Sequence, residues 1–211
     1  LGGSGEIGMN MNLFAYGRED NRKWIIVDMG VTFADDSIPG IDLIFPDPGF
    51  ILDKKNDLLG IVLTHAHEDH IGAVAHIWPS LKCKMYATPF TAALIYEKFK
   101  EKKIDISSYL KIVPLNSKIK LGAFEIDFVT LTHSILEPNG LSITTPLGTI
   151  LHTGDWKIDP NPLIGGTIDE EKLKAIGVKG VSAMICDSTN IFSPGRACLL
   201  YTSPSPRDLR K

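Results

Sequence analysis

Short apolar runs separated by polar turns make up much of the chain, and their lengths favour β-strands over helices. Strands are expected at residues 24–27, 61–63, 82–86, 110–113, 118–121, 124–132, 148–152 and 183–186. Helical periodicity is found at residues 71–81, 88–103 and 170–178, and the first of these helices is expected to stop at Pro79. This mixture of strands and helices predicts an α/β (α+β) fold.

A cluster of ligand-type side chains follows the strand expected at residues 61–63. Residues 65–70 read His-Ala-His-Glu-Asp-His. His65 and His67 are two residues apart, so in an extended segment they point the same way, and Asp69 and His70 follow after a turn. Imidazole suits zinc and carboxylate suits harder divalent ions, so the cluster predicts a metal site with mixed nitrogen and oxygen ligands. The alternative, a histidine-rich surface loop, does not account for the buried strand before it.

Two later strands are also followed by ligand-type side chains. His133 directly follows the strand at residues 124–132, and Asp155 lies in a turn just beyond the strand at 148–152. His152 is inside that strand and is expected to be structural. Three separate strand ends therefore carry histidine or aspartate side chains, and loops that meet at one edge of a sheet would assemble them into a multi-metal centre.

The chain opens with a glycine-rich stretch, Gly-Gly-Ser-Gly-Glu-Ile-Gly at residues 2–8. Its G-x-G-x-x-G spacing matches the dinucleotide-binding fingerprint, but a hairpin over residues 9–27 follows it where that fingerprint needs a βαβ unit. The glycines are expected instead to let a backbone loop pass close to a ligand or to the metal loop. Asp28, at the end of the hairpin, either orients a metal-bound histidine or forms a turn, and the sequence does not decide between these two roles.

Net charge, cysteine content and hydropathy indicate which binding partners and which compartment to expect for the chain. The formal net charge of −3 gives no overall basic field for nucleic acid, although metal ions would supply local positive charge for a phosphodiester. Three widely spaced cysteines, Cys83, Cys186 and Cys198, are expected to be reduced thiols in a cytoplasmic protein. Since no apolar run approaches the length of a membrane span and no signal peptide is visible, no membrane association is expected.

Three motifs together resemble the metallo-β-lactamase superfamily: Thr-His-Ala-His-Glu-Asp-His-Ile-Gly-Ala at residues 64–73, Leu-Thr-His-Ser at 131–134, and His-Thr-Gly-Asp-Trp-Lys-Ile-Asp-Pro at 152–160. The opening at residues 2–10 and Cys-Asp-Ser-Thr-Asn at 186–190 narrow the resemblance to the ribonuclease J family of the β-CASP nuclease branch. The resemblance implies an αββα sandwich, in which two sheets pack face to face with helices outside. It also implies that the sandwich is incomplete here, because the chain is truncated before the segment that follows the β-CASP insert and completes the domain.

The same resemblance implies two metal ions, Zn²⁺ with Mn²⁺ as the alternative, held by His65, His67, Asp69, His70, His133 and Asp155. Asp155 would bridge the two ions, and Asp69 would also be catalytic by positioning the attacking hydroxide or moving a proton. The family's last ligand, a histidine beyond the β-CASP insert, has no counterpart in the sequence. Residues 135–138, Ile-Leu-Glu-Pro, depart from the Ile-Pro-Asp/Glu-Ser of relatives, so the resemblance does not define substrate contacts in that loop.

The implied activity is metal-dependent hydrolysis of RNA phosphodiester bonds through a dinuclear zinc-activated hydroxide. It would include 5′-to-3′ exonuclease and endonuclease cleavage in RNA turnover and rRNA maturation, by a cytoplasmic protein that forms a homo-oligomer at full length. Three alternatives stay open: a thioester or lactam hydrolase on the same scaffold, a non-catalytic RNA-binding member of the family, and an inactive truncated chain.

The sequence divides into two parts. Residues 1–196 are expected to form the N-terminal part of the metallo-β-lactamase domain, with the β-CASP insert starting near 190–196. Residues 197–211 resemble translated adaptor or vector sequence and are expected to be a non-native tail, with a Ser/Pro-rich linker as the alternative.

Overall fold

The computed structural model describes residues 1–34, 38–192 and 194 of the chain. The tail expected at residues 197–211, and the last residues of the domain expected at 1–196, lie outside these described residues. Within the described ranges, no helix is both long enough and apolar enough to cross a membrane.

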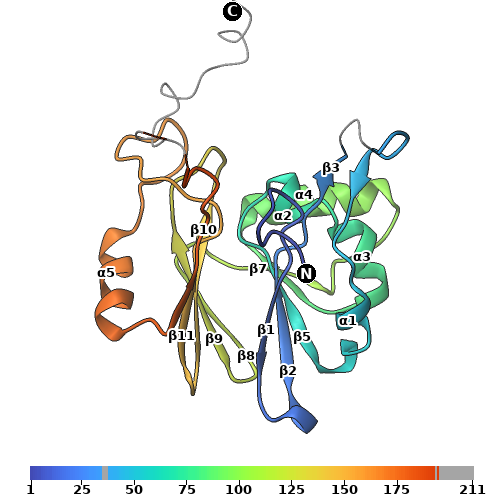
Figure 1. Ribbon diagram of the computed structural model, residues 1–211, viewed down its shortest axis with the longest axis horizontal. Helices are drawn as coiled ribbons and strands as arrows, with labels where there is room; N and C mark the ends of the chain where they lie inside the picture. Colours follow the sequence, from blue (N-terminus) through green and yellow to red (C-terminus); the bar gives the residue numbers. More distant parts are fainter. Residues whose placement is uncertain (35–37, 193, 195–211) are drawn as a thin grey trace, which may run out of the picture.

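Two sheets face each other at the centre of the molecule (Figure 1). The first is five-stranded, in the order β1 (Asn12–Tyr16), β2 (Lys23–Val27), β5 (Leu58–Val62), β6 (Met85–Ala87) and β7 (Leu110–Ile112). The second is five-stranded, in the order β12 (Ala183–Ile185), β11 (Gly148–His152), β10 (Asn139–Thr145), β9 (Phe124–Thr130) and β8 (Lys118–Leu121). In the first sheet only β1 and β2 pair antiparallel, and in the second only β11 and β12 pair parallel. A separate two-stranded sheet joins β3 (Thr32–Phe33) to β4 (Leu43–Ile44).

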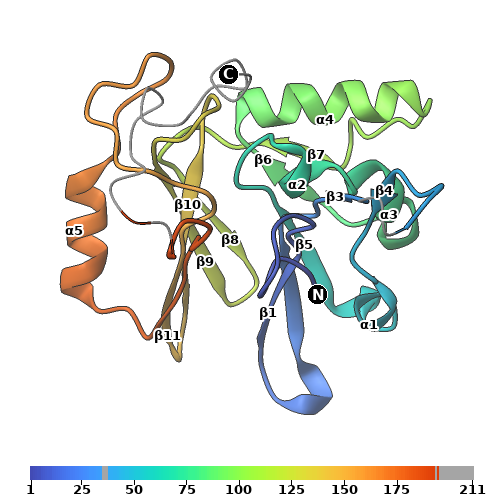
Figure 2. The ribbon, with the colours of Figure 1, turned by 45° about the horizontal axis from the view of Figure 1, so that its top comes forward.

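Helices cover the outer face of each sheet (Figures 1 and 2). Three lie outside the first sheet, namely α1 (Gly49–Leu52), α3 (Val74–Leu81) and α4 (Pro89–Glu101), and α5 (Glu170–Lys179) lies outside the second. The short α2 (Glu68–Ile71) follows β5, and two 3₁₀ turns, η1 (Glu19–Asn21) and η2 (Lys55–Asp57), precede β2 and β5. This layer order confirms the predicted αββα sandwich.

Alternation along the central strands builds two separate cores. Successive side chains of a strand point to opposite faces, so Ile26 of β2 and Ile61 of β5 pack under the helices, while Val27 and Val62 pack between the two sheets. All four side chains are fully buried. Because both faces of the first sheet are covered, its inner strands are apolar almost without interruption, which is the pattern that predicted them as buried strands.

One strand of the two five-stranded sheets, β10, is absent from the predictions, as are the two-residue strands β3 and β4. β10 is central in the second sheet and its first five residues are buried, yet it reads Asn-Gly-Leu-Ser-Ile-Thr-Thr. The Asn-Gly start is typical of a turn, and the hydroxyl side chains interrupt the apolar pattern. Pairing with β9 and β11 on both sides overrides these local preferences.

The predicted stop of a helix at Pro79 is wrong. α3 includes Pro79 and ends at Leu81, and the next residue, Lys82, adopts a left-handed conformation with φ of 50°. Proline removes one hydrogen bond from the helix, but the buried Trp78 and Leu81 keep the last turn packed on the core. The other two predicted helices correspond to α4 and α5.

Gly30 marks the closest approach between the loop after β2 and the start of α2. A Cβ atom at this position would lie 1.6 Å from the Asp69 carbonyl oxygen and 2.6 Å from the His70 nitrogen. By contrast, a Cβ atom on Gly177, inside α5, would meet no atom within 4 Å. The glycine at position 30 is therefore required by packing, and the glycine at 177 is not.

We expect the Gly30→Ala substitution to lower the free energy of unfolding by about 2–3 kcal/mol or more, because the backbone around Asp69 must move to admit the methyl group. Gly177→Ala should instead be neutral or stabilising by up to about 1 kcal/mol, since alanine is the better helix former. Denaturant unfolding of both variants measures the difference. Equal stability of the two variants would contradict the close approach.

Candidate metal centre

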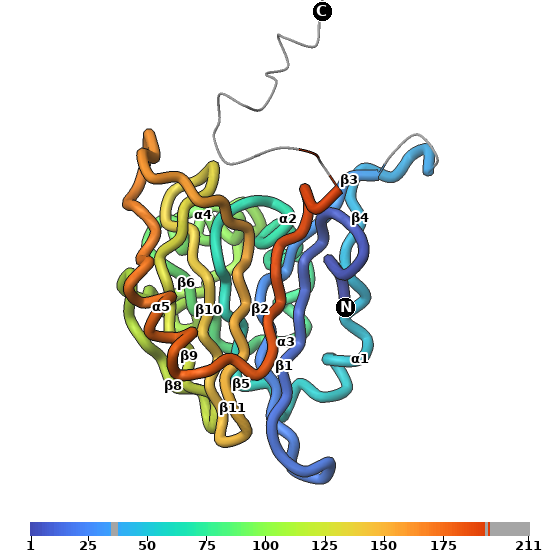
Figure 3. Tube along the Cα trace, turned by 60° about the vertical axis from the view of Figure 1, so that its left-hand side comes forward, coloured from blue at the N-terminus to red at the C-terminus, as the bar shows by residue number. Residues whose placement is uncertain are grey.

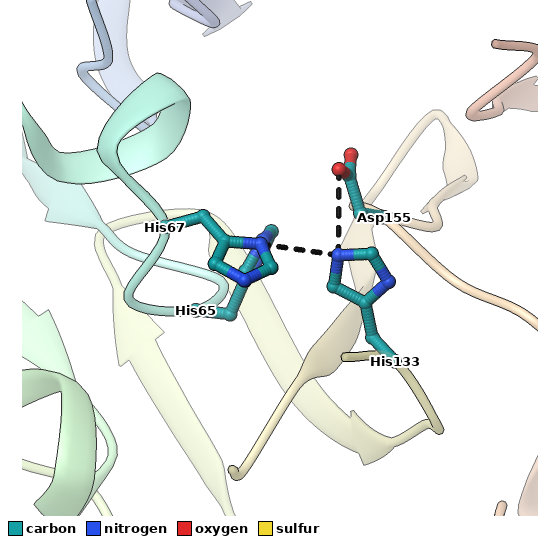
Figure 4. Close-up of side chains that lie close together, drawn as sticks. All are labelled: His65, His67, His133 and Asp155. Atoms are coloured by element: carbon teal, nitrogen blue, oxygen red, sulfur yellow. Dashed lines mark hydrogen bonds and ion pairs between the residues drawn. The ribbon is translucent and has the colours of Figure 1, made fainter. Parts of the chain in front are cut away.

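Three loops bring the predicted ligand residues to one end of the molecule. His65 and His67 follow β5, His133 follows β9, and Asp155 follows β11. All three strands run toward the upper end in Figure 1, so their loops meet where the two sheets face each other. In Figure 4 the two histidines of the first sheet lie opposite His133 and Asp155 of the second.

The first group consists of His65, His67, His133 and Asp155, whose ligand atoms lie within 4.8 Å of one another. The His67 Nδ1 atom is 3.1 Å from both His65 Nε2 and His133 Nε2, and His133 Nε2 is 3.6 Å from Asp155 Oδ2. Zinc–nitrogen bonds of about 2.0–2.1 Å place tetrahedral ligands roughly 3.3 Å apart. The spacing and the donor set therefore fit a zinc ion.

The second group consists of Asp69, His70 and Asp155. The His70 Nε2 atom is 3.1 Å from Asp155 Oδ1 and 3.5 Å from Asp69 Oδ2. The two oxygens of Asp155 thus face different groups, Oδ2 toward His133 and Oδ1 toward His70. This geometry fits a carboxylate shared by two ions, and the oxygen-rich second group also suits harder divalent ions.

Asp28 supports the second group from the core. It is fully buried and accepts hydrogen bonds from the Thr64 backbone N–H and hydroxyl, both at 2.8 Å. The His70 Nδ1 atom lies 2.7 Å from Asp28 Oδ2, so Nδ1 carries the proton and Nε2 faces the other carboxylates. Of the two roles that the sequence left open for Asp28, the structure favours the orienting one. Thr64 was missed, because a threonine gives no ligand signal in the sequence.

His152 supports the turn that carries Asp155. It is buried in β11, as a structural residue should be, and its Nδ1 atom accepts a hydrogen bond from the Gly154 N–H at 3.1 Å. Gly154 has a φ of 56°, a conformation that glycine adopts without strain. The prediction that His152 is structural therefore agrees with its position, and its contact fixes the backbone next to Asp155.

The pKa shifts in the centre favour a cation at His65 and Asp155 and a proton at His70. Burial, followed by repulsion from His70, His133 and His67, holds the pKa of His65 well below its usual value, so its ring is neutral and keeps a lone pair. Burial would raise the pKa of Asp155, but hydrogen bonding and attraction to His70 outweigh it and lower that pKa. Burial would likewise lower the pKa of His70, yet Asp28 and the hydrogen bonds to the surrounding carboxylates raise it. A divalent ion would therefore displace a proton from His70.

A cavity of about 790 Å³ adjoins the second group. Its walls come from the glycine-rich loop at residues 3–8 and from residues 185–192, and Asp69, His70 and Asp155 lie in its lining. Both walls lie at the same end of the molecule in Figure 3. Directly after this loop, the Asn10 N–H donates to the Asp69 carbonyl of the metal stretch at 2.9 Å.

We expect Asp28→Asn to lower the free energy of unfolding of the metal-free chain by about 3–5 kcal/mol. The buried carboxylate is bonded by three donors, and the NH₂ group of an asparagine would face one of these donors with a donor of its own. Asp57→Asn is the matched control. Its partner Lys23 and Asp57 itself are each about two-fifths exposed, so the loss should stay within about 1 kcal/mol. Chemical denaturation compares the two variants, and equal losses would contradict the supporting role of Asp28.

Comparisons with known proteins agree with this geometry. Residues 23–184 match a family model described as the beta-lactamase superfamily domain. The chain is 45% identical over 209 residues to ribonuclease J of Sinorhizobium meliloti, covering 99% of this chain and 36% of that protein. It is 40% identical over 196 residues to ribonuclease J of Helicobacter pylori, covering 92% of this chain and 28% of that protein.

The chain thus spans about a third of the length of these curated relatives. A solved structure of a protein of unknown function from Enterococcus faecalis has the same fold, with a TM-score of 0.59 at 18% identity over 96% of this chain and 51% of that one. On the family model, which matches most of its length, and on the sandwich described above, the chain belongs to the beta-lactamase superfamily, and it is similar to ribonuclease J over nearly all of its sequence.

Proposed function

We propose that the chain is the metal-binding part of a ribonuclease that hydrolyses RNA phosphodiester bonds with two divalent ions. The observation that carries this proposal is the pair of ligand groups that share Asp155, one oxygen facing each group. Similarity to ribonuclease J proteins supports RNA as the substrate. The proposal includes 5′-to-3′ exonuclease and endonuclease cleavage in RNA turnover and rRNA maturation, in the cytoplasm and in a homo-oligomer of the whole protein.

Each ligand group would hold one ion. The three histidines with Asp155 favour Zn²⁺, whereas Asp69, His70 and Asp155 would accept Zn²⁺ or Mn²⁺. Bound ions would lower the pKa of water toward neutrality and stabilise the charge on the phosphate oxygens.

The residues of the chain would hold and move protons around these ions. Asp69 has a lowered pKa, since its hydrogen bond and attraction to His70 outweigh the effect of burial, so its carboxylate is ionised at neutral pH. It lines the cavity and would position the attacking water and accept its proton. Asp28 would keep the Nε2 atom of His70 aimed at the second ion, because its bond to Nδ1 fixes the ring.

The cavity offers space for the substrate. Its volume of about 790 Å³ lies within the range of about 300–1,000 Å³ common for small-ligand pockets, so a nucleotide unit with its phosphate fits beside the second group. A thioester or lactam hydrolase would use the same ligand set. We favour RNA because the similarity to ribonuclease J covers the glycine-rich loop and residues 185–192, which form the cavity walls, as well as the ligands.

Activity is best tested by placing this chain in a whole enzyme. We expect a chimera in which it replaces the matching segment of Sinorhizobium meliloti ribonuclease J to cleave single-stranded RNA. His65→Ala should lower the rate by at least about a thousandfold, because the ions supply several kcal/mol of transition-state stabilisation. His76→Ala, an exposed histidine of α3, is the control and should leave the rate unchanged. Equal activity of the two variants, or cleavage that persists after metal chelation, would contradict the proposal.

Metal content tests the shared ligand separately from activity. We expect Asp69→Ala to retain one ion and lose the other, and Asp155→Ala to weaken both, because only Asp155 belongs to both groups. Elemental analysis after gel filtration counts the ions bound to each variant. If Asp155→Ala lost no more metal than Asp69→Ala, Asp155 would not be shared.

A further inference from the structure

Asn10 connects the glycine-rich loop to the second ligand group. It lies between that loop and β1, and its backbone N–H and carbonyl bond to the Asp69 carbonyl and the Gly30 N–H, each at 2.9 Å. Its side-chain Nδ2 atom donates to the same Asp69 carbonyl at 3.1 Å. One carbonyl of the metal stretch therefore accepts two hydrogen bonds from a single residue.

The orientation of the Asn10 amide follows from these contacts. A carbonyl oxygen can only accept, so the side-chain atom that faces Asp69 must be the NH₂ group. The same nitrogen lies 3.2 Å from His70 Nε2 and 3.5 Å from Asp69 Oδ2. Because His70 Nδ1 is bonded to Asp28, Nε2 is the ring nitrogen left for the second ion, and the Asn10 amide lies beside it.

We propose that Asn10 is a positioning residue for the second metal ion, an inference that rests on the proposed two-ion function. It holds the Asp69 backbone by two hydrogen bonds and lies beside His70 Nε2, so it contacts two of the three ligands of the second group. In the described part of the chain, its side chain has no hydrogen bond to His65, His67 or His133. Its effect is therefore confined to the second ion.

The second ion matters for substrate binding because of the charge of the cavity. Among the described residues that line it there is no lysine or arginine, whereas the carboxylates of Glu6, Asp69, Asp155 and Asp187 do line it. A phosphate is attracted to such a cavity only when bound cations offset the carboxylates. Residues that position the second ion thereby control the affinity for RNA without contacting it.

The test is a stepwise titration of the metal-free chain with Co²⁺, whose visible absorption reports each binding step. We expect Asn10→Ala to weaken the second step by about 10- to 100-fold, as supporting partners of metal ligands do, and to leave the first step unchanged. Asn12→Ala is the matched control, because the described structure gives the Asn12 side chain no hydrogen bond to Asp69 or His70. It should bind both ions as the unsubstituted chain does.

A second variant tests whether the side chain at position 10 acts as a hydrogen-bond donor or as a metal ligand. Asn10→Asp keeps the shape of the side chain but has no N–H for the Asp69 carbonyl, so it should also weaken the second step, despite its negative charge. Tighter binding in this variant, or unchanged second steps in both variants, would overturn the proposal.

Two further results would also overturn it. If Asn10→Ala weakened both steps equally, the residue would serve the fold and not the second ion. If the unsubstituted chain bound a single ion, the proposed two-ion function would be wrong, and the role of Asn10 with it. If the unsubstituted chain bound two ions and only the variants differed from expectation, the role of Asn10 alone would be wrong.

Discussion

A buried carboxylate holds the metal centre together. Asp28 directly follows β2 and is bonded by three donors from the segment after β5, two on Thr64 and one on His70. An unpaired carboxylate in the core would cost several kcal/mol, so these two loops cannot separate. The Thr64 carbonyl in turn accepts from the Asn139 backbone N–H at 3.2 Å, at the start of β10. One chain of hydrogen bonds therefore runs from Asp28 at the first sheet through Thr64, the residue before the ligand His65, to the second sheet.

Most of the candidate site could be predicted from the sequence, because its side chains follow apolar strands. Residues 65–70, His133 and Asp155 are marked by residue type and by position after a strand, and the fold places those strand ends together. Asp28 could not be assigned, since an aspartate after a strand reads equally as a turn former. Only the distance to His70 separates the two roles.

The sequence pattern does not reveal residues whose hydrogen-bond partners are far away along the chain. Thr88 has the sequence of a helix N-cap, yet its side chain makes no capping bond, and the Phe90 N–H of α4 is bonded instead by Glu137 at 2.8 Å. Glu137 lies in the loop between β9 and β10, so its bond connects that loop to α4 of the first sheet. Asn10 was likewise part of a glycine-rich opening whose pattern suggested only close approach. In each case the partner is far away in the sequence, and local pattern carries no information about it.

Anomalous diffraction from crystals of the zinc-loaded chain would locate the two proposed ions that share Asp155. We expect two anomalous peaks about 3.5–4 Å apart, one beside His65, His67 and His133, the other beside Asp69 and His70, with Asp155 between them. A single peak, or zinc bound by other residues, would contradict a two-ion centre.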